Sequence, residues 1–457
     1  MRAHHRRRLG RIGQGRALAA PASGWADSGS FPPRAGNRVE LLVDGAEALP
    51  RMAADVCEAQ SHVHIAGWFF TPGIRLGEDG PTLAALLAET AEQVPVRVLS
   101  WAGAPLPLFH PDRSEVRQMR SVLTRGTRIE VELDARERPM HCHHEKLVLV
   151  DDRVAYVGGI DLTTFAGNRL DTSMHRARGE LGWHDACVRL QGPVVADVAE
   201  HFRRRWPGAL PAVAQQEPAE GIDIQLVRTV PEGLYSGLDR GEFTVLESYL
   251  RALRGAERFI YLESQFLWSS EIVSVLVDKL RNPPSDDFRL VVVLPARPNN
   301  GEEDTRGQIG VLVDADKEAG DGTDRFLACT LYQPGRGGTI VYVHAKIGIV
   351  DDRWLTIGSA NLNEHSLFND TEVNVVLHDE EFARAARLRL WREHLERDDV
   401  DGDPVRVVDE LWRPIAEEEL TRRRNEGYVE RRLTLLPRVS RRAEALWGPL
   451  TGLLVDG

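Results

Sequence analysis

One internal repeat constrains the fold of this chain more than any other feature. The stretch HEKLVLVDDRVAYVGGIDL, which begins at His144, aligns without a gap on HAKIGIVDDRWLTIGSANL, which begins 200 residues later at His344. In each copy the apolar run after the lysine predicts a strand, Asp-Asp-Arg predicts a turn, and a second strand ends at Gly-Gly or Gly-Ser. A strand-turn-strand unit used twice predicts a duplicated architecture.

The order of the predicted elements recurs in the two halves of the chain, and strands alternate with a helix as in βα units. In the first half we predict a helix over Thr82–Glu92 and strands at His62–Phe70, Val96–Trp101 and Ile129–Leu133. In the second half the corresponding helix is Glu271–Leu280, and the strands are Phe259–Phe266, Arg289–Leu294 and Cys329–Tyr332.

The repeat and the local composition divide the chain into four parts. Residues 1–38 are rich in Arg, Gly, Pro and Ala without apolar periodicity, so we predict a disordered basic arm. A stretch with Pro, Ala, Gln and Glu around 207–221 separates a first half, 39–215, from a second half, 216–403. We predict a helical C-terminal extension over residues 404–457.

Composition and charge exclude several classes of protein. With 42% hydrophobic and 28% charged residues, the 457-residue chain is typical of a globular protein with two or three core-forming units. The formal net charge of -12 argues against a protein that coats nucleic acid or anionic membrane by bulk electrostatics. Four scattered cysteines predict no disulfide framework, and no apolar run reaches the roughly 18 residues of a spanning helix.

The repeats carry chemistry as well as structure. Both contain the pattern HxKxxxxD, at His144, Lys146 and Asp151 and again at His344, Lys346 and Asp351. Residues i and i+2 of a strand project to one face, so the His and Lys of each copy share a pocket. A phosphodiester is an anion, so its cleavage needs positive charge at its oxygens, a nucleophile and a leaving-group acid. Two lysines and two histidines meet that need without a metal, because imidazole can serve in either role near neutral pH.

On these residues the sequence resembles the phospholipase D superfamily, whose defining HKD motif this is. The resemblance covers nearly all of 39–395 and favours the phosphatidylcholine-type phospholipase D branch. The further segments that carry it are GGIDLTTFAGNRLD followed by His175, WHDACVRLQGP from Trp183, YLESQF, and GSANLNEHSLFNDTEVNV from Gly358. In two departures, Ser264 replaces an Asn, and Glu364-His365 stands where an Arg often precedes a Ser.

The resemblance implies a fold and a mechanism. The expected class is α/β, with two duplicated α/β/α sandwich halves that contain mixed β-sheets and are related by a pseudo-twofold axis, with the active site at their interface. His144 is expected to attack phosphorus and form a phosphohistidine, and His344 to protonate the departing alcohol. The two HKD lysines would hold the phosphate oxygens, and the two HKD aspartates would fix the turns of their motifs.

Each catalytic imidazole also needs a carboxylate at its far nitrogen. We predict Asp171 for His144 and Glu372 for His344, which lie 27 and 28 residues beyond those histidines, where the family has such a group. Besides the lysines, the predicted phosphate-binding residues are Gly159, Ser359 and Asn361. No cofactor and no metal is predicted, because the adjacent residues 141–143 alternate faces on a strand and cannot all reach one ion.

The predicted function is that of a phospholipase D, which hydrolyses glycerophospholipids to phosphatidic acid and headgroup and transfers the phosphatidyl group to alcohols. Two alternatives remain open: a cardiolipin-synthase-like phosphatidyltransferase, and a nuclease or other phosphodiesterase of the same superfamily, which the negative net charge disfavours. The expected partner is a phospholipid at a membrane surface, contacted peripherally by a cytoplasmic protein. No stable nucleic acid partner is expected.

Overall fold

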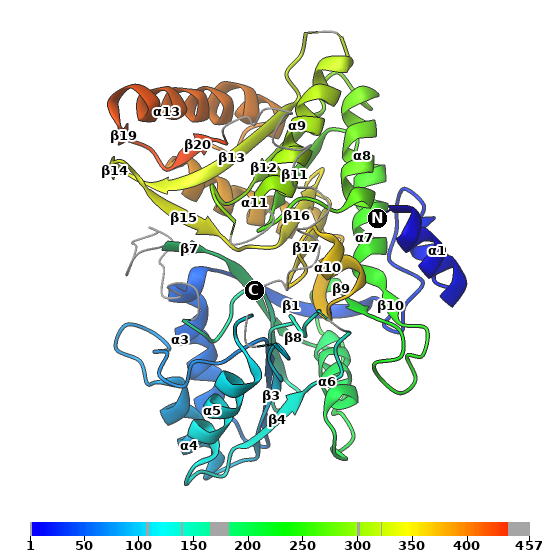
Figure 1. Cartoon of the computed structure of the whole chain (residues 1–457), viewed down its shortest axis with the longest axis vertical. Helices are drawn as coiled ribbons and strands as arrows, with labels where there is room; N and C mark the ends of the chain where they lie inside the picture. The colour runs from blue at the N-terminus through cyan, green and yellow to red at the C-terminus, as the bar shows by residue number, and fades with distance from the viewer. Residues whose placement is uncertain are drawn as a thin grey trace.

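The computed structural model describes residues 2–106, 109–138, 140–164, 182–298, 302–320 and 322–436. Within these ranges the chain forms two α/β halves that are stacked along the long axis of the molecule (Figure 1). Most blue and cyan elements make up the lower half, and most green, yellow and orange elements make up the upper half, with the dark blue N-terminal helix beside it. This is the duplicated α/β arrangement that the repeat predicts.

The first half is built on a mixed sheet with the strand order β4-β3-β2-β5-β6-β8-β1. Strands β2, β3 and β4 are parallel, and the other neighbours are antiparallel. The bounds are β1 (Arg34–Val43), β2 (Val63–Gly67), β3 (Val96–Trp101), β4 (Glu130–Asp134), β5 (Leu147–Val150), β6 (Val154–Gly158) and β8 (Ala186–Gln191).

The second half repeats this plan strand for strand, in the order β13-β12-β11-β16-β17-β18-β9. Again the first three strands are parallel and the others antiparallel, with the HKD strand β16 in the place of β5. The bounds are β9 (Ile222–Val230), β11 (Phe259–Glu263), β12 (Arg289–Val293), β13 (Phe326–Gln333), β16 (Ile347–Val350), β17 (Trp354–Gly358) and β18 (Glu372–Leu377).

Helices cover both faces of each sheet, which makes each half an α/β/α sandwich. One hydrophobic cluster joins the outer face of the first sheet to three helices, and another does the same in the second half. These helices are α3 (Asp44–Cys57), α4 (Leu83–Ala91) and α5 (Arg113–Thr124), and α7 (Thr244–Gly255), α8 (Ser270–Arg281) and α9 (Glu302–Glu318). The opposite faces share a single cluster that includes α6 (Val194–Arg205) and α11 (Glu380–Leu395), so one core is common to both halves.

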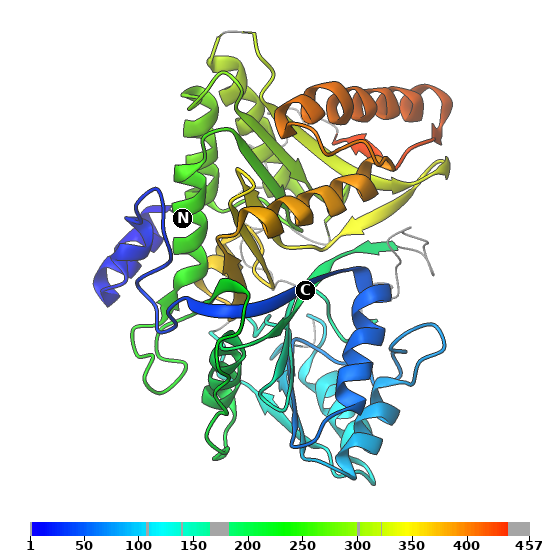
Figure 2. The same cartoon turned by 180° about the vertical axis from the view of Figure 1, so that it is seen from behind.

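The two sheets meet edge to edge. Strand β1 pairs with β8 along most of its length, and its first residues pair antiparallel with β9, the equivalent strand of the other half. Figure 2 shows β1, in blue, crossing the boundary between the halves. A second connection is parallel, between β7 (Gly182–His184) and β15 (Thr339–Val343). Backbone pairing therefore ties the halves together at two separate places.

The strands and helices predicted from the sequence are confirmed, with ends that differ by a few residues. The predicted strand Val96–Trp101 is β3, and the predicted helix Thr82–Glu92 is α4. Four of the helices that pack on the outer faces, α3, α5, α7 and α9, were not predicted. A signal for α5 exists in the sequence, because Asp112 and Glu115 form a reciprocal capping box at its N-terminus.

The prediction of a disordered arm over 1–38 is wrong for most of its length. Residues Arg2–Ile12 form helix α1, Gly15–Leu18 form α2, and β1 begins at Arg34. The side chain of Leu9 is fully buried in the cluster of α7 and α8. The buried guanidinium of Arg8 contacts the carboxylate of Glu232. The local composition could not predict helix α1, because the acidic residues that neutralise its arginines lie more than 200 residues away in the sequence.

The C-terminal extension is helical only in part. Helices α12 (Pro404–Val407) and α13 (Arg413–Glu426) flank the π-helical turn η1 (Val408–Trp412). Strand β20 (Leu433–Leu435) then pairs antiparallel with β13 and extends the second sheet. The division at 215/216 stays a prediction.

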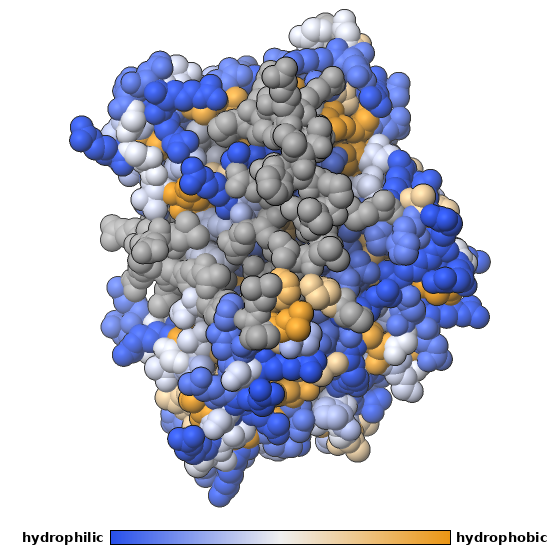
Figure 3. Space-filling model, in the orientation of Figure 1, coloured by the Kyte–Doolittle hydropathy of each residue, from blue (hydrophilic) through white to orange (hydrophobic). Residues whose placement is uncertain are grey.

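The surface of the described residues carries little concentrated apolar area. The exposed large hydrophobic side chains are Leu106, Val122 and Tyr428, which lie on separate elements. In Figure 3 the coloured part of the face is mainly hydrophilic, with apolar residues in separate patches. Within the described ranges, none of the helices combines the length and apolar character needed to cross a bilayer.

We predict that Leu9→Ala releases α1 from the second half. The substitution removes a fully buried side chain and should weaken the packing of α1 by about 2–4 kcal/mol. Trypsin should then cleave the arginine-rich helix faster than in the wild type, as measured by mass spectrometry. The control is Arg7→Ala, at an exposed position of the same helix. Rapid cleavage of the wild type, equal to that of Leu9→Ala, would contradict the packed arm.

Candidate active site

Each HKD motif enters its strand beside a segment of the opposite half. The N–H of His144 donates to the carbonyl of Thr371 at 3.0 Å, and the preceding residue forms a parallel bridge to Thr371. Equivalently, the N–H of His344 donates to the carbonyl of His184 at 2.8 Å, where β15 pairs with β7. The two equivalent registers bring both motifs to the boundary between the halves.

The two motif imidazoles are anchored by carboxylates from the opposite half. Nδ1 of His144 lies 3.0 Å from Oε1 of Glu372, and Nδ1 of His344 lies 2.7 Å from Oδ2 of Asp185. All four side chains are buried. One proton must lie between a ring nitrogen and a carboxyl oxygen at this distance, so Nδ1 of each ring is engaged by the carboxyl group. Nε2 is then the atom that each ring can present to a reacting group.

The carboxylate of Glu372 is held by two further donors. The hydroxyl of Ser359 donates to Oε2 at 2.5 Å, and the hydroxyl of Ser366 donates to Oε1 at 2.6 Å. Burial raises the pKa of Glu372 well above its usual value, although the charge of Lys146 and these hydroxyls oppose the rise. A fully buried carboxyl group with such donors is fixed in orientation, and it fixes the ring of His144 in turn.

The two motif lysines are buried beside the histidines. Nζ of Lys146 donates to the carbonyl of His144 at 2.6 Å and lies 3.2 Å from Oδ2 of Asp161. Nζ of Lys346 donates to the carbonyl of His344 in the same way. Each lysine therefore contacts the backbone of the histidine of its own motif, just before β5 or β16 begins.

The environment of Lys346 brings charges of both halves together. Its burial lowers its pKa to about 7, and the positive charge of Lys146 adds to this effect. The carboxylates of Asp185, Glu372 and Asp161 act in the opposite direction. Because groups from both halves act on one buried ammonium, the motifs form one electrostatic site, not two.

The comparisons with known proteins agree with this geometry. Residues 249–393 match the family described as cardiolipin synthase, PLD-like domain. Phospholipase D A of Dictyostelium discoideum is 25% identical over an alignment that covers 80% of this chain. The chain belongs to the phospholipase D superfamily. It spans only 36% of the length of the Dictyostelium protein.

Other similar members of the superfamily differ in activity. The major cardiolipin synthase ClsA of Bacillus subtilis is 24% identical over 75% of this chain and 66% of its own length. The crystal structure of phosphatidylserine synthase from Haemophilus influenzae has a TM-score of 0.57 and 12% identity, and the match covers 84% of this chain and 89% of that chain. The structural match supports the duplicated fold of the superfamily.

One predicted carboxylate pairing is wrong. Glu372, which we assigned to His344, contacts His144 in the other half. Asp171, which we assigned to His144, lies outside the described residues. The partner of His344 is Asp185, which the sequence analysis did not include among the site residues.

A signal for Asp185 exists in the register of the two sheets. The second strand after each HKD motif ends at a glycine, Gly158 in β6 and Gly358 in β17. In each half the carboxylate residue stands two positions before the residue that pairs with this glycine in the neighbouring strand. Asp185 lies 41 residues after the motif histidine of its own half, whereas Glu372 lies 28 residues after its own. The longer connection in the first half displaced Asp185 from the spacing that the prediction used.

Of the remaining predicted phosphate-binding residues, two support the carboxylates. A Cβ on Gly159 would lie 2.1 Å from Oδ1 of Asp185, so only glycine leaves room for that carboxylate. Ser359, the equivalent residue, donates to Glu372. Asn361 donates to Oε1 of Gln265 at 3.4 Å, and its own side-chain oxygen is buried without a hydrogen-bond partner. Contact of these residues with phosphate stays a prediction.

The two HKD aspartates lie at turns, away from the histidines, although the predicted catalytic set included them. Asp151 accepts backbone N–H groups from residues 60–62, and Asp351 accepts those of residues 257–259. Both have positive φ, at 58° and 51°. They secure the turn after each HKD strand to the segment that leads into the neighbouring strand, which is the turn-fixing role expected of them.

We predict that Asp151→Asn lowers the stability by about 1–3 kcal/mol at pH 7, because the carboxylate accepts several charge-assisted hydrogen bonds. Burial opposes ionisation, yet the N–H donors lower the pKa of Asp151 overall. The stabilisation is therefore present above the unfolded pKa of about 3.9 and is lost as the pH falls through the lower folded pKa. Thermal unfolding at decreasing pH should show the variant and wild type converging.

The control for this prediction is Asp223→Asn, at an exposed position of β9. It should unfold at the wild-type temperature across the same pH range. An Asp151→Asn protein that is as stable as this control at pH 7 would show that the turn does not depend on the carboxylate.

Proposed function

We propose that this chain is a phospholipase D-type phosphodiesterase, which hydrolyses glycerophospholipids to phosphatidic acid and headgroup. The observation that carries the proposal is the crossed anchoring of two buried imidazoles by carboxylates, beside two buried lysines. This set provides a nucleophile, an acid and positive charge for a single phosphodiester. The similarity to phospholipases D supports the substrate class and the phosphatidylcholine-type branch.

In the first step Nε2 of His144 attacks phosphorus, and the bond between phosphorus and the headgroup oxygen breaks. His344, protonated on both nitrogens, donates its Nε2 proton to that oxygen, so the headgroup leaves as a neutral alcohol. Glu372 balances the charge that develops on the ring of His144, and Asp185 stabilises the imidazolium of His344 before transfer. The products of this step are the free headgroup and a phosphatidyl-histidine.

In the second step water takes the place of the headgroup. Neutral His344 removes a proton from the water, the oxygen attacks phosphorus, and the P–N bond to His144 breaks. Phosphatidic acid leaves, and both rings return to their starting protonation states. An alcohol that replaces water yields the transphosphatidylation product by the same transfers.

The lysines are the groups that bind the phosphate in this proposal. Lys146 and Lys346 are compact cations whose ammonium groups lie beside the motif histidines. They would neutralise the non-bridging oxygens, which repel an incoming nucleophile. Gly159, Ser359 and Asn361 complete the proposed set of phosphate-binding residues.

A specific observation favours a second candidate, a cardiolipin-synthase-like phosphatidyltransferase. The family that matches residues 249–393 is described as cardiolipin synthase, and ClsA of Bacillus subtilis is similar over 75% of this chain. In that reaction the second step would use the hydroxyl of a phosphatidylglycerol in place of water. The same histidines and lysines would serve both reactions.

We further propose that the substrate is reached at a membrane surface by peripheral contact, from the cytoplasm. The relatives that act on lipids support the first part. The four cysteines are unpaired thiols, which supports a reducing compartment. Helix α1 exposes the guanidinium of Arg7 and other basic side chains, which would favour contact with anionic headgroups.

The experiment that tests the function supplies purified protein with phosphatidylcholine, phosphatidylglycerol and single-stranded DNA in parallel, with EDTA and ethanol present. Phosphatidic acid together with phosphatidylethanol is the expected result, because the intermediate can be captured by either acceptor. Cardiolipin formed from phosphatidylglycerol would favour the phosphatidyltransferase. Cleavage of DNA alone would contradict both lipid reactions.

We predict that His144→Ala and His344→Ala each reduce phosphodiester turnover by at least about 1,000-fold, because each ring has a role that the other cannot fill. The matched control is His110→Ala, an exposed histidine outside the site. Circular dichroism should show all three variants folded. Wild-type turnover in either motif variant would contradict the shared site.

We also predict that kcat/KM falls as the pH rises through about 7, because Lys346 of the free enzyme loses its proton there. An uncharged amine no longer attracts the phosphate, so the loss occurs on the alkaline side. Lys346→Arg, whose side chain stays protonated, should have lower activity but no alkaline fall in this range. An identical alkaline limb in both proteins would assign the titration to another group.

A further inference from the structure

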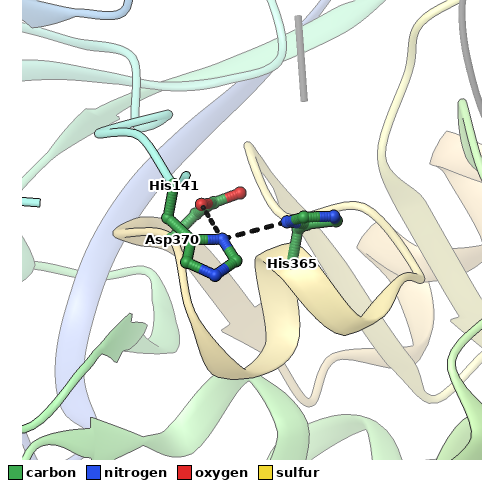
Figure 4. Close-up of side chains that lie close together, drawn as sticks. All are labelled: His141, His365 and Asp370. Atoms are coloured by element: carbon green, nitrogen blue, oxygen red, sulfur yellow. Dashed lines mark hydrogen bonds and ion pairs between the residues drawn. The ribbon is translucent and has the colours of Figure 1, made fainter. Parts of the chain in front are cut away.

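A cluster of potential metal ligands lies at the boundary between the halves, next to the active site. His141 precedes the first HKD motif, His365 lies in α10 (Glu364–Phe368), and Asp370 stands just before β18. Nδ1 of His141 is 3.0 Å from Nδ1 of His365 and 3.3 Å from Oδ1 of Asp370. In Figure 4 the two rings and the carboxylate converge on one another from the two halves of the chain.

The carboxylate of Asp370 is not satisfied by protein groups alone. The residue is fully buried, and Oδ1 accepts the backbone N–H of Cys142 at 3.0 Å. Oδ2 is buried without a hydrogen-bond partner. A buried carboxylate oxygen without a donor or cation is costly, so this atom points to a missing positively charged partner.

The donor set and its spacing fit a transition metal. Two imidazole nitrogens and one carboxylate oxygen are ligands typical of Zn²⁺. Tetrahedral ligands at the usual zinc distances lie about 3.3 Å from one another, close to the two separations in the cluster. The side chain of His141 is 17% exposed, so the cluster borders solvent on that side.

The two other potential ligand groups among the described residues differ from this cluster in their access to solvent or in the contacts that their histidine already makes. In one, His184, Glu263 and His394 are completely buried, which leaves no route for an ion. In another, His184 is joined by Asp44 and Glu393, yet both of its ring nitrogens already contact carboxylates, of Asp44 and Glu263. These groups form a buried ion-pair network.

We propose that His141, His365 and Asp370 bind one Zn²⁺ ion, with water as a further ligand, and that the ion clips the two halves together beside the catalytic pair. His141 stands three residues before His144, and Asp370 stands two residues before Glu372. An ion at this position therefore braces the His144–Glu372 contact without taking part in phosphoryl transfer. His365 is one of the positions where this chain departs from the superfamily pattern.

Zinc binding by the full-length, tag-free protein tests this proposal without any assay of activity. The protein is stripped with EDTA, desalted and titrated with Zn²⁺ in a calorimeter. The wild type and the control variant His110→Gln should each bind one equivalent. His141→Gln and Asp370→Asn should bind Zn²⁺ at least about tenfold more weakly, because each variant loses a direct ligand. Loss of a residue that merely supports a metal ligand already weakens binding by about tenfold or more.

Thermal unfolding supplies the second readout and shows that the variants are folded. In EDTA all four proteins should unfold cooperatively. Added Zn²⁺ should raise the midpoint of the wild type and of His110→Gln by at least about 2 °C, because the ion binds only the folded state, and should leave that of His141→Gln unchanged. A wild type that binds no Zn²⁺, or a His141→Gln protein that binds it as the wild type does, would overturn the proposal.

Discussion

The interaction on which the site depends is the contact of each catalytic imidazole with a carboxylate from the opposite half. Glu372 and Asp185 are buried, and a buried carboxylate is stable only when it is paired and hydrogen-bonded. Neither half contains the imidazole that its own carboxylate contacts. The halves must therefore meet in one register, which the paired strands β1–β9 and β7–β15 provide. The site is therefore complete only when both halves are folded and paired.

The two halves have similar backbones, but the side chains around their catalytic carboxylates differ. This difference separates the roles of the two histidines. Glu372 receives hydroxyls from Ser359 and Ser366, whereas Asp185 lies against Gly159. Burial raises the pKa of Glu372 far above its usual value. Two rings in different electrostatic surroundings can be neutral and protonated at the same pH, as a nucleophile and an acid must be. We therefore regard the asymmetry as a requirement of the proposed mechanism.

Features encoded by local pattern could be predicted from the sequence, whereas features that depend on distant contacts could not. The repeat and the apolar runs predict the strands, because the period of a strand is visible within a few residues. The crossed partner of His344 was missed because spacing along the chain describes only a residue's own half. Helix α1 was missed because Arg8 and Leu9 are stabilised by residues of the second half. The turn role of Asp151 followed directly from its position in the motif.

The crossed pairing is tested most directly by the burst of p-nitrophenol from a p-nitrophenyl ester of phosphatidic acid, compared with headgroup release from phosphatidylcholine. p-Nitrophenolate leaves without protonation. This substrate should therefore restore the rate of the first step in a variant whose general acid is impaired, but not in a variant whose nucleophile is impaired. Asp185→Asn should regain a near-wild-type burst, as His344→Ala does, whereas Glu372→Gln should stay slow, as His144→Ala does. The reverse pattern, with rescue of Glu372→Gln and not of Asp185→Asn, would contradict this account.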